Sequence, residues 1–264
     1  IRPKIPACHR RQCMKSSVIT PIRGRLPGEA RPAFGAVSGD VDLCAPASEA
    51  PAPGAPVSEA WLDTLAAGLT ESGWMSLDVR EQLGQRLLQG LLEEVRILDV
   101  TESMKEAGIG RGADLTQDRS VRRDRIAWLQ GATVPQQALL RFLDEVRMGL
   151  SRRLFLGLKR VEAHYATYHP GDFYRRHVDS FAGRASRVVS LVLYLNDEWA
   201  STDGGALQIY NRDSQSEVCG IVLPEMGRMA LFMSEDIPHE VLPANRTRYS
   251  LACWFRQDEV PLPL

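Results

Sequence analysis

The sequence predicts an α+β protein whose core is a jelly roll, also called a double-stranded β-helix, with supporting helices before it. In the first half of the 264-residue chain apolar residues recur at helical spacing, whereas the second half consists of short β-type runs separated by turn residues. Strands that follow helices without alternating with them favour an antiparallel sheet that is closed or doubled. We therefore expect one domain over residues 58–264, with helices in 58–158 and the jelly-roll core in 159–257.

Residues 1–57 differ in composition from this domain. They are rich in Pro, Ala, Gly and Arg and show no apolar period, so we interpret them as a disordered extension. The stretch up to about residue 28 contains basic residues and no acidic one, as transit peptides do. The alternatives are a flexible extension or an overlong gene start.

Three helices are expected in the first part of the domain. They begin at Ser58, Asp78 and Thr133, and the last two complete capping-box patterns with Glu81 and Gln136. Behind each cap, apolar residues recur every three or four positions and form the face that packs against the core. These residues are Trp61, Leu62, Leu65, Ala66 and Leu69 in the first helix, Leu83, Leu87, Leu91 and Val95 in the second, and Leu139, Leu140, Leu143, Val146 and Leu150 in the third.

Two short strands are expected among these helices, over residues 73–77 and 125–129. The glycine-rich stretch 108–112 is interpreted as a loop, because no strand precedes it and its glycine spacing differs from that of a dinucleotide-binding turn. Further along, β-type runs bounded by turn residues predict six more strands. These cover residues 161–168, 187–195, 206–210, 218–223, 228–233 and 249–256.

The overall composition argues against several kinds of partner. A net charge of -1 provides no basic field for nucleic acid, and no apolar run approaches the roughly 18 residues of a membrane span. The cysteines, 5 in number, lack the paired spacing of a zinc site, which suits a reducing compartment better than a disulfide framework. We therefore expect a cytoplasmic protein that binds neither nucleic acid nor membranes.

The most informative motif is the pair His177 and Asp179, followed far downstream by His239. Two imidazoles and one carboxylate hold Fe(II) in non-haem sites while leaving one face of the octahedron open. Because a strand points residues i and i+2 to the same side, we expect His177 and Asp179 to reach one ion together. The histidines without such a context, which we expect not to bind the metal, are His9, His164 and His169.

A β-type stretch downstream of His239 carries a cation suited to an acidic co-substrate. Arg248 begins it, and a guanidinium binds a carboxylate through two hydrogen bonds, as the far end of a dicarboxylic 2-oxo acid requires. Arg246, two residues earlier, is an alternative for the same role. Tyr194 lies in a very apolar strand, where a buried hydroxyl needs a partner; the co-substrate carboxylate is one candidate, and simple packing is the other interpretation.

Taken together, several segments resemble the 2-oxoglutarate- and Fe(II)-dependent prolyl 4-hydroxylases. The resemblance is strongest to the branch that contains the animal oxygen-sensing prolyl hydroxylases and their bacterial homologues, and it covers residues 58–257. The segments are Arg123-Asp-Arg-Ile-Ala-Trp-Leu-Gln-Gly, Tyr168-His-Pro-Gly-Asp-Phe-Tyr-Arg-Arg-His-Val-Asp, Tyr194-Leu-Asn, Gly204-Gly205 and His239-Glu-Val-Leu-Pro-Ala-Asn-Arg-Thr-Arg-Tyr.

This resemblance implies roles for individual residues. His177, Asp179 and His239 would bind iron and form the catalytic centre. Three further residues would form the 2-oxoglutarate pocket, namely Arg248 and Tyr194 at the distal carboxylate and Tyr168 on the wall. Two residues would contact the peptide substrate, namely Arg187 and, at the base of a flexible loop over 108–122, Asp124.

The resemblance also implies the reaction. The enzyme would be a dioxygenase that uses Fe(II), O2 and 2-oxoglutarate, with ascorbate as a reductant for the iron. It would hydroxylate a prolyl residue of a protein at C4 while 2-oxoglutarate becomes succinate. Elongation factor Tu, a substrate of bacterial relatives, is the expected target.

Two alternatives remain open from the sequence. The same iron chemistry would also serve a small-molecule substrate. A non-catalytic jelly-roll module that senses oxygen or 2-oxoglutarate is the second alternative, against which the complete triad and Arg248 argue.

Overall fold

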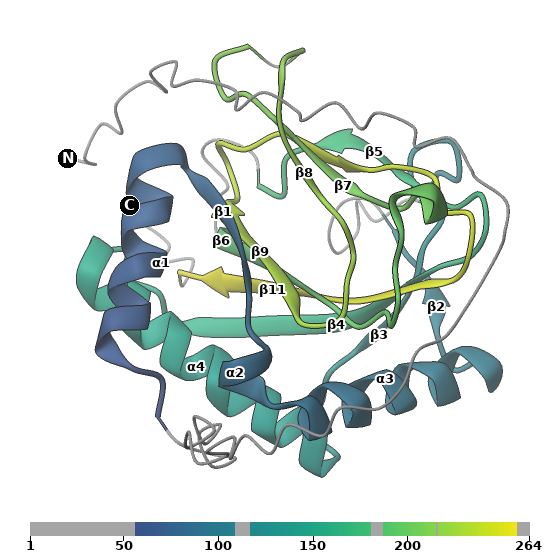
Figure 1. The fold of residues 1–264 in the computed structure, drawn as a ribbon, viewed down its shortest axis with the longest axis horizontal. Coiled ribbons are helices and arrows are strands. Elements are labelled where there is room, and N and C mark those ends of the chain that lie inside the picture. Colours follow the sequence, from purple (N-terminus) through teal and green to yellow (C-terminus); the bar gives the residue numbers. More distant parts are fainter. Residues whose placement is uncertain (1–55, 109–116, 181–186, 215, 258–264) are drawn as a thin grey trace, which may run out of the picture. The chain divides into compact units, whose positions relative to one another are not determined.

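The computed structural model describes residues 56–108, 117–180, 187–214 and 216–257. The disordered extension predicted for residues 1–57 therefore lies almost wholly outside the described residues. The described part forms three layers, in which helices cover one face of a large sheet and a smaller sheet lies over the opposite face (Figure 1). This arrangement confirms the predicted α+β jelly roll with supporting helices.

The helices begin where the capping residues predicted, with one exception. Ser58 caps α1 (Glu59–Ser72) and Thr133 caps α4 (Val134–Leu154), each accepting a backbone N–H with its hydroxyl oxygen. The single helix predicted from Asp78 is wrong. The structure has a short α2 (Arg80–Leu83) and a separate α3 (Gln85–Val100), because Gly84 between them adopts a left-handed φ of 75°.

The buried face of α3 agrees with the prediction at Leu91 and Val95 and differs at one predicted position. Leu88, Leu91, Leu92 and Val95 point into the core, whereas the predicted Leu87 is only partly buried against it. Asp78 itself ends a strand, and its carboxylate accepts the Arg80 backbone N–H at 2.9 Å. The predicted N-cap at Asp78 is therefore wrong: Val79 precedes the four-residue α2, and no side chain caps this helix.

The strands form two antiparallel sheets. The large sheet has the order β1-β9-β6-β11-β4-β3-β2 and the small sheet the order β5-β10-β7-β8. The bounds are β1 Trp74–Asp78, β2 Lys105–Glu106, β3 Arg125–Trp128, β4 Arg160–Tyr168, β5 Tyr174–His177, β6 Arg187–Tyr194, β7 Leu207–Tyr210, β8 Val218–Val222, β9 Arg228–Met233, β10 His239–Val241 and β11 Arg248–Arg256. All eight predicted strands exist within one or two residues of the predicted bounds; β2, β5 and β10 were not predicted.

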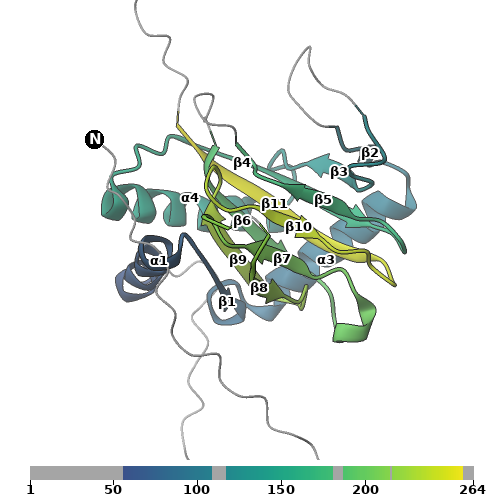
Figure 2. The same cartoon turned by 90° about the horizontal axis from the view of Figure 1, so that it is seen from above.

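Strand alternation sorts side chains between the two faces of the large sheet. On β6, Leu191 and Leu193 pack against the helices, whereas Ser190 and Tyr194 face the small sheet. The helix-side cluster is completed by apolar residues of α1, α3 and α4. In Figure 2, α3 and α4 run behind the strands and α1 lies beside them. The second cluster fills part of the space between the two sheets, and the rest of that space is a cavity.

Among the described residues, no helix has both the length and the apolar composition needed to cross a lipid bilayer. In the same part of the chain, Cys219 is exposed and Cys253 is buried.

Candidate active site

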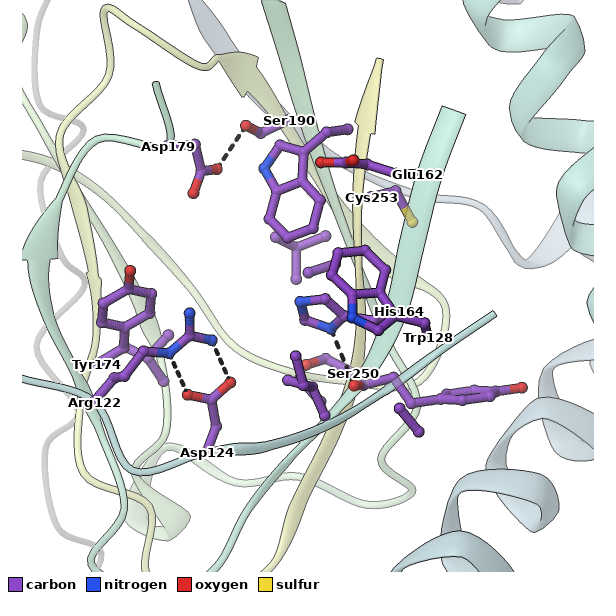
Figure 3. A pocket seen from close by; sticks show the side chains of 18 of the residues that line it. Arg122, Asp124, Trp128, Glu162, His164, Tyr174, Asp179, Ser190, Ser250 and Cys253 are labelled. Carbon is purple, nitrogen blue, oxygen red and sulfur yellow. Dashed lines mark hydrogen bonds and ion pairs between the residues drawn. The ribbon is translucent and has the colours of Figure 1, made fainter. Parts of the chain in front are cut away.

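The cavity between the sheets has a volume of about 1280 Å³ and gathers most of the residues singled out in the sequence. Its walls come from β3, β4, β5, β6, β10 and β11, and Figure 3 shows the open space between their side chains. His177, Asp179 and His239 lie on one side of it, and Arg248 and Tyr168 also line it. The predicted metal ligands, Arg248 and Tyr168 therefore share one cavity, whereas Tyr194 lies behind its wall, next to Arg248.

The three predicted ligands meet, but through a different local structure from the one expected. His177 is the last residue of β5 and faces His239, the first residue of β10, across the sheet. The expectation that one strand carries both His177 and Asp179 is wrong, because the chain bends after His177. Asp179 is held instead by its backbone N–H, which donates to the carbonyl oxygen of Ser234 at 3.0 Å.

The geometry of this triad suits a metal ion. The potential ligand atoms of His177, Asp179 and His239 all lie within 4.8 Å of one another, and no other such group of three occurs among the described residues. The Asp179 carboxylate lies 3.6 Å from Nε2 of His177 and 3.8 Å from Nε2 of His239. Two imidazoles and a carboxylate on one side of an open cavity match the facial arrangement that Fe(II) uses.

Backbone carbonyls set the tautomer of both imidazoles. Nδ1 of His177 lies 2.7 Å from the Arg175 oxygen, and Nδ1 of His239 lies 3.0 Å from the Ile237 oxygen. Because a carbonyl only accepts, each Nδ1 carries the proton and each Nε2 keeps its lone pair for a metal. Burial, assisted by the nearby His177, lowers the pKa of His239 to about 4, so this ring is neutral at physiological pH.

A pair of buried serines orients the third ligand. Burial alone would raise the pKa of Asp179, but the two imidazoles and a hydrogen bond from Ser190 hold it well below its usual range. Ser190 donates its single hydroxyl proton to Asp179 Oδ2 at 2.6 Å, so it must accept from Ser234, whose hydroxyl lies 2.8 Å away. Ser190 and Ser234 were not predicted, because nothing in the sequence links two serines so far apart.

Replacing Ser190 with alanine is therefore expected to weaken metal binding by about 10- to 100-fold, the usual effect of losing a residue that orients a ligand. Titration of the metal-free protein with Co(II), followed by calorimetry, measures this directly. Ser201→Ala, at an exposed serine far from Asp179 in sequence, is the matched control and should bind Co(II) like the unmodified protein. Equal affinities for the Ser190 variant and the control would show that the serine pair does not hold Asp179.

Arg248 provides a buried positive charge in the cavity that the triad lines. It is 1% exposed, donates from Nε to the Gly205 oxygen at 2.8 Å and from Nη1 to Ser250 Oγ at 3.0 Å, and forms no ion pair with any acidic residue in the described ranges. A buried guanidinium without an acid is costly unless an anion from outside completes it. Arg248 thus fits a carboxylate ligand that enters the cavity.

Two tyrosines flank this guanidinium. The Arg248 carbon Cζ lies 4.8 Å from the Tyr168 ring centroid and 5.0 Å from that of Tyr194. The Tyr194 hydroxyl is fully buried and meets no partner at full hydrogen-bond geometry, although the Arg248 guanidinium is close enough to interact with it. Burial raises the pKa of Tyr194 to about 12, and the charge of Arg248 and its hydrogen-bonding interaction with the hydroxyl oppose the shift. An unsatisfied buried hydroxyl next to an uncompensated cation is the pattern expected for a pocket that receives a carboxylate.

The alternative cation, Arg246, lies outside the cavity. Its guanidinium donates to the Asp197 oxygen at 2.6 Å, approaches Asp203 Oδ2 at 3.2 Å and stacks over Trp199. Its side chain is 44% exposed. The structure therefore distinguishes the two candidate arginines, because Arg248 lines the cavity and Arg246 does not.

The two predicted substrate residues line the cavity and are held in ion pairs. Asp124, 1% exposed, receives two hydrogen bonds from Arg122, at 2.8 and 2.6 Å, as Figure 3 shows. Arg187 donates to Glu162 at 2.6 Å and stacks on Trp254, with its Cζ 3.6 Å from the ring centroid. The expected substrate loop over 108–122 lies partly outside the described residues.

Arg122 is a cavity residue that the sequence reasoning missed. Its Cζ lies 4.3 Å from the Tyr174 ring centroid, and that ring stacks on the His177 imidazole with centroids 3.5 Å apart. A chain of contacts through Arg122 and Tyr174 therefore connects the Asp124 carboxylate to the predicted metal ligand His177. The signal was present in the i, i+2 spacing of Arg122 and Asp124, which lets both side chains lie on one side of an extended segment.

His164 and His169 do not join the triad. His164 lines the cavity from β4, and burial lowers its pKa to about 4. His169 pairs with Asp99 at 3.2 Å outside the cavity. The expectation for His9 falls outside the described residues.

The buried, neutral His164 makes the stability of the fold depend on pH. The ordinary pKa of 6.5 applies to the unfolded chain, which therefore takes up a proton at a higher pH than the folded chain does. The free energy of unfolding should fall by about 2 kcal/mol between about pH 7 and pH 5 on account of this residue, and His239 adds to the trend in the metal-free protein. Urea denaturation at both pH values checks this, and His164→Phe should show a smaller fall; an identical fall would contradict it.

The chain has clear relatives among known proteins. The family model described as the 2OG-Fe(II) oxygenase superfamily matches residues 163–256, which include the triad and Arg248. Human prolyl hydroxylase EGLN3 is 31% identical over 196 residues, which cover 71% of this chain and 80% of the human protein. Rat Egl nine homolog 1 is 31% identical over 187 residues, and the matched part is 54% of its length.

Solved structures point the same way. A Pseudomonas putida prolyl-4-hydroxylase aligns with a TM-score of 0.67 and 36% identity, over 74% of this chain and 99% of that one. A Trichoplax adhaerens prolyl hydroxylase, solved with a peptide fragment of the hypoxia inducible factor oxygen degradation domain, aligns with a TM-score of 0.64 and 27% identity. That alignment covers 75% of this chain and 90% of the other.

A jelly roll whose inner cavity joins a His-Asp-His triad to a buried arginine defines an Fe(II)- and 2-oxoglutarate-dependent dioxygenase. Iron and the 2-oxo acid fit the residues present, since both imidazoles present a free Nε2 and Arg248 lacks an acid. Within this class, the chain belongs to the prolyl hydroxylase family.

Proposed function

We propose that this protein hydroxylates a prolyl residue of a protein substrate at C4, with 2-oxoglutarate as co-substrate. The observation that carries the proposal is the 31% identity to a human prolyl hydroxylase over 80% of its length, combined with a complete triad and a buried Arg248 in one cavity. When bound, Fe(II), O2 and 2-oxoglutarate supply the oxidant for the C–H bond, and 2-oxoglutarate leaves as succinate and CO2. Ascorbate would keep the iron reduced.

The chain supplies placement for this chemistry. Nε2 of His177 and of His239 and the carboxylate of Asp179 would hold the iron, leaving the cavity side of the ion for the co-substrate. The Ser234–Ser190 pair would fix the Asp179 carboxylate, so that one geometry is available before the metal binds.

The opposite end of the co-substrate would be held by Arg248. Its guanidinium and the Tyr194 hydroxyl would bind the distal carboxylate, satisfying a buried cation and a buried hydroxyl at once. Tyr168 would form the wall beside them. Fixing the distal end orients the keto acid towards the triad, which is the positioning that the reaction needs.

The substrate would enter past the ion pairs that line the cavity. Asp124, held by Arg122, and Arg187, held by Glu162, are the proposed contacts with the protein substrate. Asp124 and Arg122 neutralise each other, whereas Glu162 is shared by Arg187 and Arg256, so that group keeps a net positive charge. Both groups offer polar atoms to a backbone segment around a proline.

The experiment that tests the function uses the purified protein with Fe(II), 2-oxoglutarate and ascorbate in a cell lysate. Succinate is quantified, and peptides are searched by mass spectrometry for prolines that gain one oxygen atom. The proposal predicts 2-oxoglutarate-dependent modification of at least one proline, and elongation factor Tu and a cytoplasmic setting stay predictions within it. Succinate formation with no modified proline would overturn the prolyl assignment in favour of a small-molecule substrate.

A further inference from the structure

His164 packs in the cavity wall against two tryptophans that also contact each other. Its ring centroid lies 5.0 Å from that of Trp128, edge-on at 90°, and 5.2 Å from that of Trp254, and the two indole rings are 6.5 Å apart. The residue is 3% exposed and sits on β4. Contact with both indole rings restricts the orientation of the imidazole, so its two nitrogens keep defined directions.

The backbone decides which nitrogen of His164 carries the proton. Nδ1 lies 3.0 Å from the Tyr165 carbonyl oxygen, which only accepts, so Nδ1 is the donor. Burial lowers the pKa of this imidazole to about 4, so the ring is neutral and Nε2 keeps its lone pair. Nε2 has no hydrogen-bond partner within the described part of the chain, and Figure 3 shows this second nitrogen directed into the open middle of the cavity.

The neighbouring charged groups already have partners. Arg122 is bound to Asp124, and Arg187 to Glu162, so neither pair needs His164. The Trp254 indole N–H is buried and has no partner in the described ranges. His164 thus offers an unused acceptor and Trp254 an unused donor, on adjacent rings. A backbone segment with one N–H and one C=O satisfies both.

We propose that His164 determines substrate specificity by accepting a hydrogen bond from a backbone amide N–H of the bound prolyl peptide, while Trp254 donates to a carbonyl oxygen of the same segment. This inference rests on the proposed prolyl hydroxylation and adds the chemical feature that is recognised. Discrimination against small molecules follows, because a metabolite without a peptide N–H leaves the buried acceptor unsatisfied.

The test uses a synthetic peptide that spans the proline found modified in the lysate, together with analogues in which each backbone N–H near that proline is replaced in turn by an ester oxygen. With the unmodified enzyme, one ester analogue should show a KM about 10-fold above that of the parent peptide. His164→Phe, which keeps an aromatic ring and loses the acceptor, should show this raised KM with the parent peptide and no further increase with that ester. His164→Gln, which restores an acceptor, should recover part of the loss.

Two readouts separate recognition from a structural role. The KM for 2-oxoglutarate should stay the same in His164→Phe, since Arg248 and not His164 faces that carboxylate. His169→Phe, at a histidine outside the cavity, is the matched control and should leave the peptide KM unchanged.

The outcomes distinguish this inference from the proposed function. The inference about His164 is overturned if the unmodified enzyme hydroxylates the parent peptide and has the same KM for every ester analogue. It is also overturned if the same ester raises the KM equally in the unmodified enzyme and in His164→Phe. In both cases the proposed prolyl hydroxylation is unaffected. If the unmodified enzyme hydroxylates no prolyl peptide, both are overturned. The ester series on the unmodified enzyme needs no variant, so the inference stays testable even if His164→Phe fails to fold.

Discussion

Asp179→Ala should abolish 2-oxoglutarate turnover and remove metal binding, while the fold is retained. Asp179 is the one carboxylate of the triad and lies within reach of both imidazoles, at 3.6 and 3.8 Å. Without it, two imidazoles remain, which hold a divalent ion far more weakly than a three-ligand set with a carboxylate does. Succinate formation and Co(II) titration measure the two losses, and circular dichroism checks the fold.

Asp179→Asn is the matched variant for this prediction. It keeps the size of the side chain and loses the charge, so it should fail in the same way if the carboxylate binds the metal. Turnover within about 10-fold of the unmodified protein in either variant would be incompatible with a metal centre at this triad, because an essential ligand contributes far more than that.

Arg248→Ala is expected to raise the KM for 2-oxoglutarate by about 30-fold or more. Removing one partner of a buried, hydrogen-bonded charge pair costs about 2–5 kcal/mol, and each 1.4 kcal/mol is a factor of about ten. This cost applies to Arg248 because its side chain is 1% exposed and has no acidic partner in the described part of the chain, so that the 2-oxoglutarate carboxylate would be its partner. Steady-state kinetics with varied 2-oxoglutarate gives the result, and Arg248→Lys, which keeps the charge but loses the fork of donors, should fall in between.

Arg246→Ala is the matched control, since this arginine is exposed and binds Asp203 and backbone oxygens outside the cavity. Its KM for 2-oxoglutarate should match that of the unmodified protein. The reverse pattern, with Arg246→Ala impaired and Arg248→Ala intact, would mean that the strand direction at β11 is assigned incorrectly.

The features that the sequence predicted well are those with strong local patterns. Alternation over β6 and β11 located both strands, and the same alternation places Arg248 and Tyr194 on the cavity side and Leu193 on the helix side. Hydroxyl caps at Ser58 and Thr133 located two helix starts. Each of these signals depends on residues a few positions apart, which a single sequence shows directly.

The features that it missed depend on tertiary partners. β5 reads Tyr-Arg-Arg-His and β10 is three residues long, so neither shows an apolar period, yet their pairing brings His177 opposite His239. The bend that carries Asp179 exists because Ser234 accepts its backbone N–H. Gly84 breaks the predicted helix, although the apolar spacing continues across it. The spacing of apolar side chains does not show the left-handed backbone conformation of the glycine, so the break was not predicted.

We propose that the protein hydroxylates prolyl residues with O2 in the cavity that contains the triad and Arg248. The most direct measurement is a reaction of the purified protein with its prolyl peptide, Fe(II) and 2-oxoglutarate under isotopically labelled O2. The expected result is 4-hydroxyproline that carries the label, with one succinate formed per hydroxyl group. Hydroxyproline without label, or labelled succinate with an unmodified proline, would contradict the account.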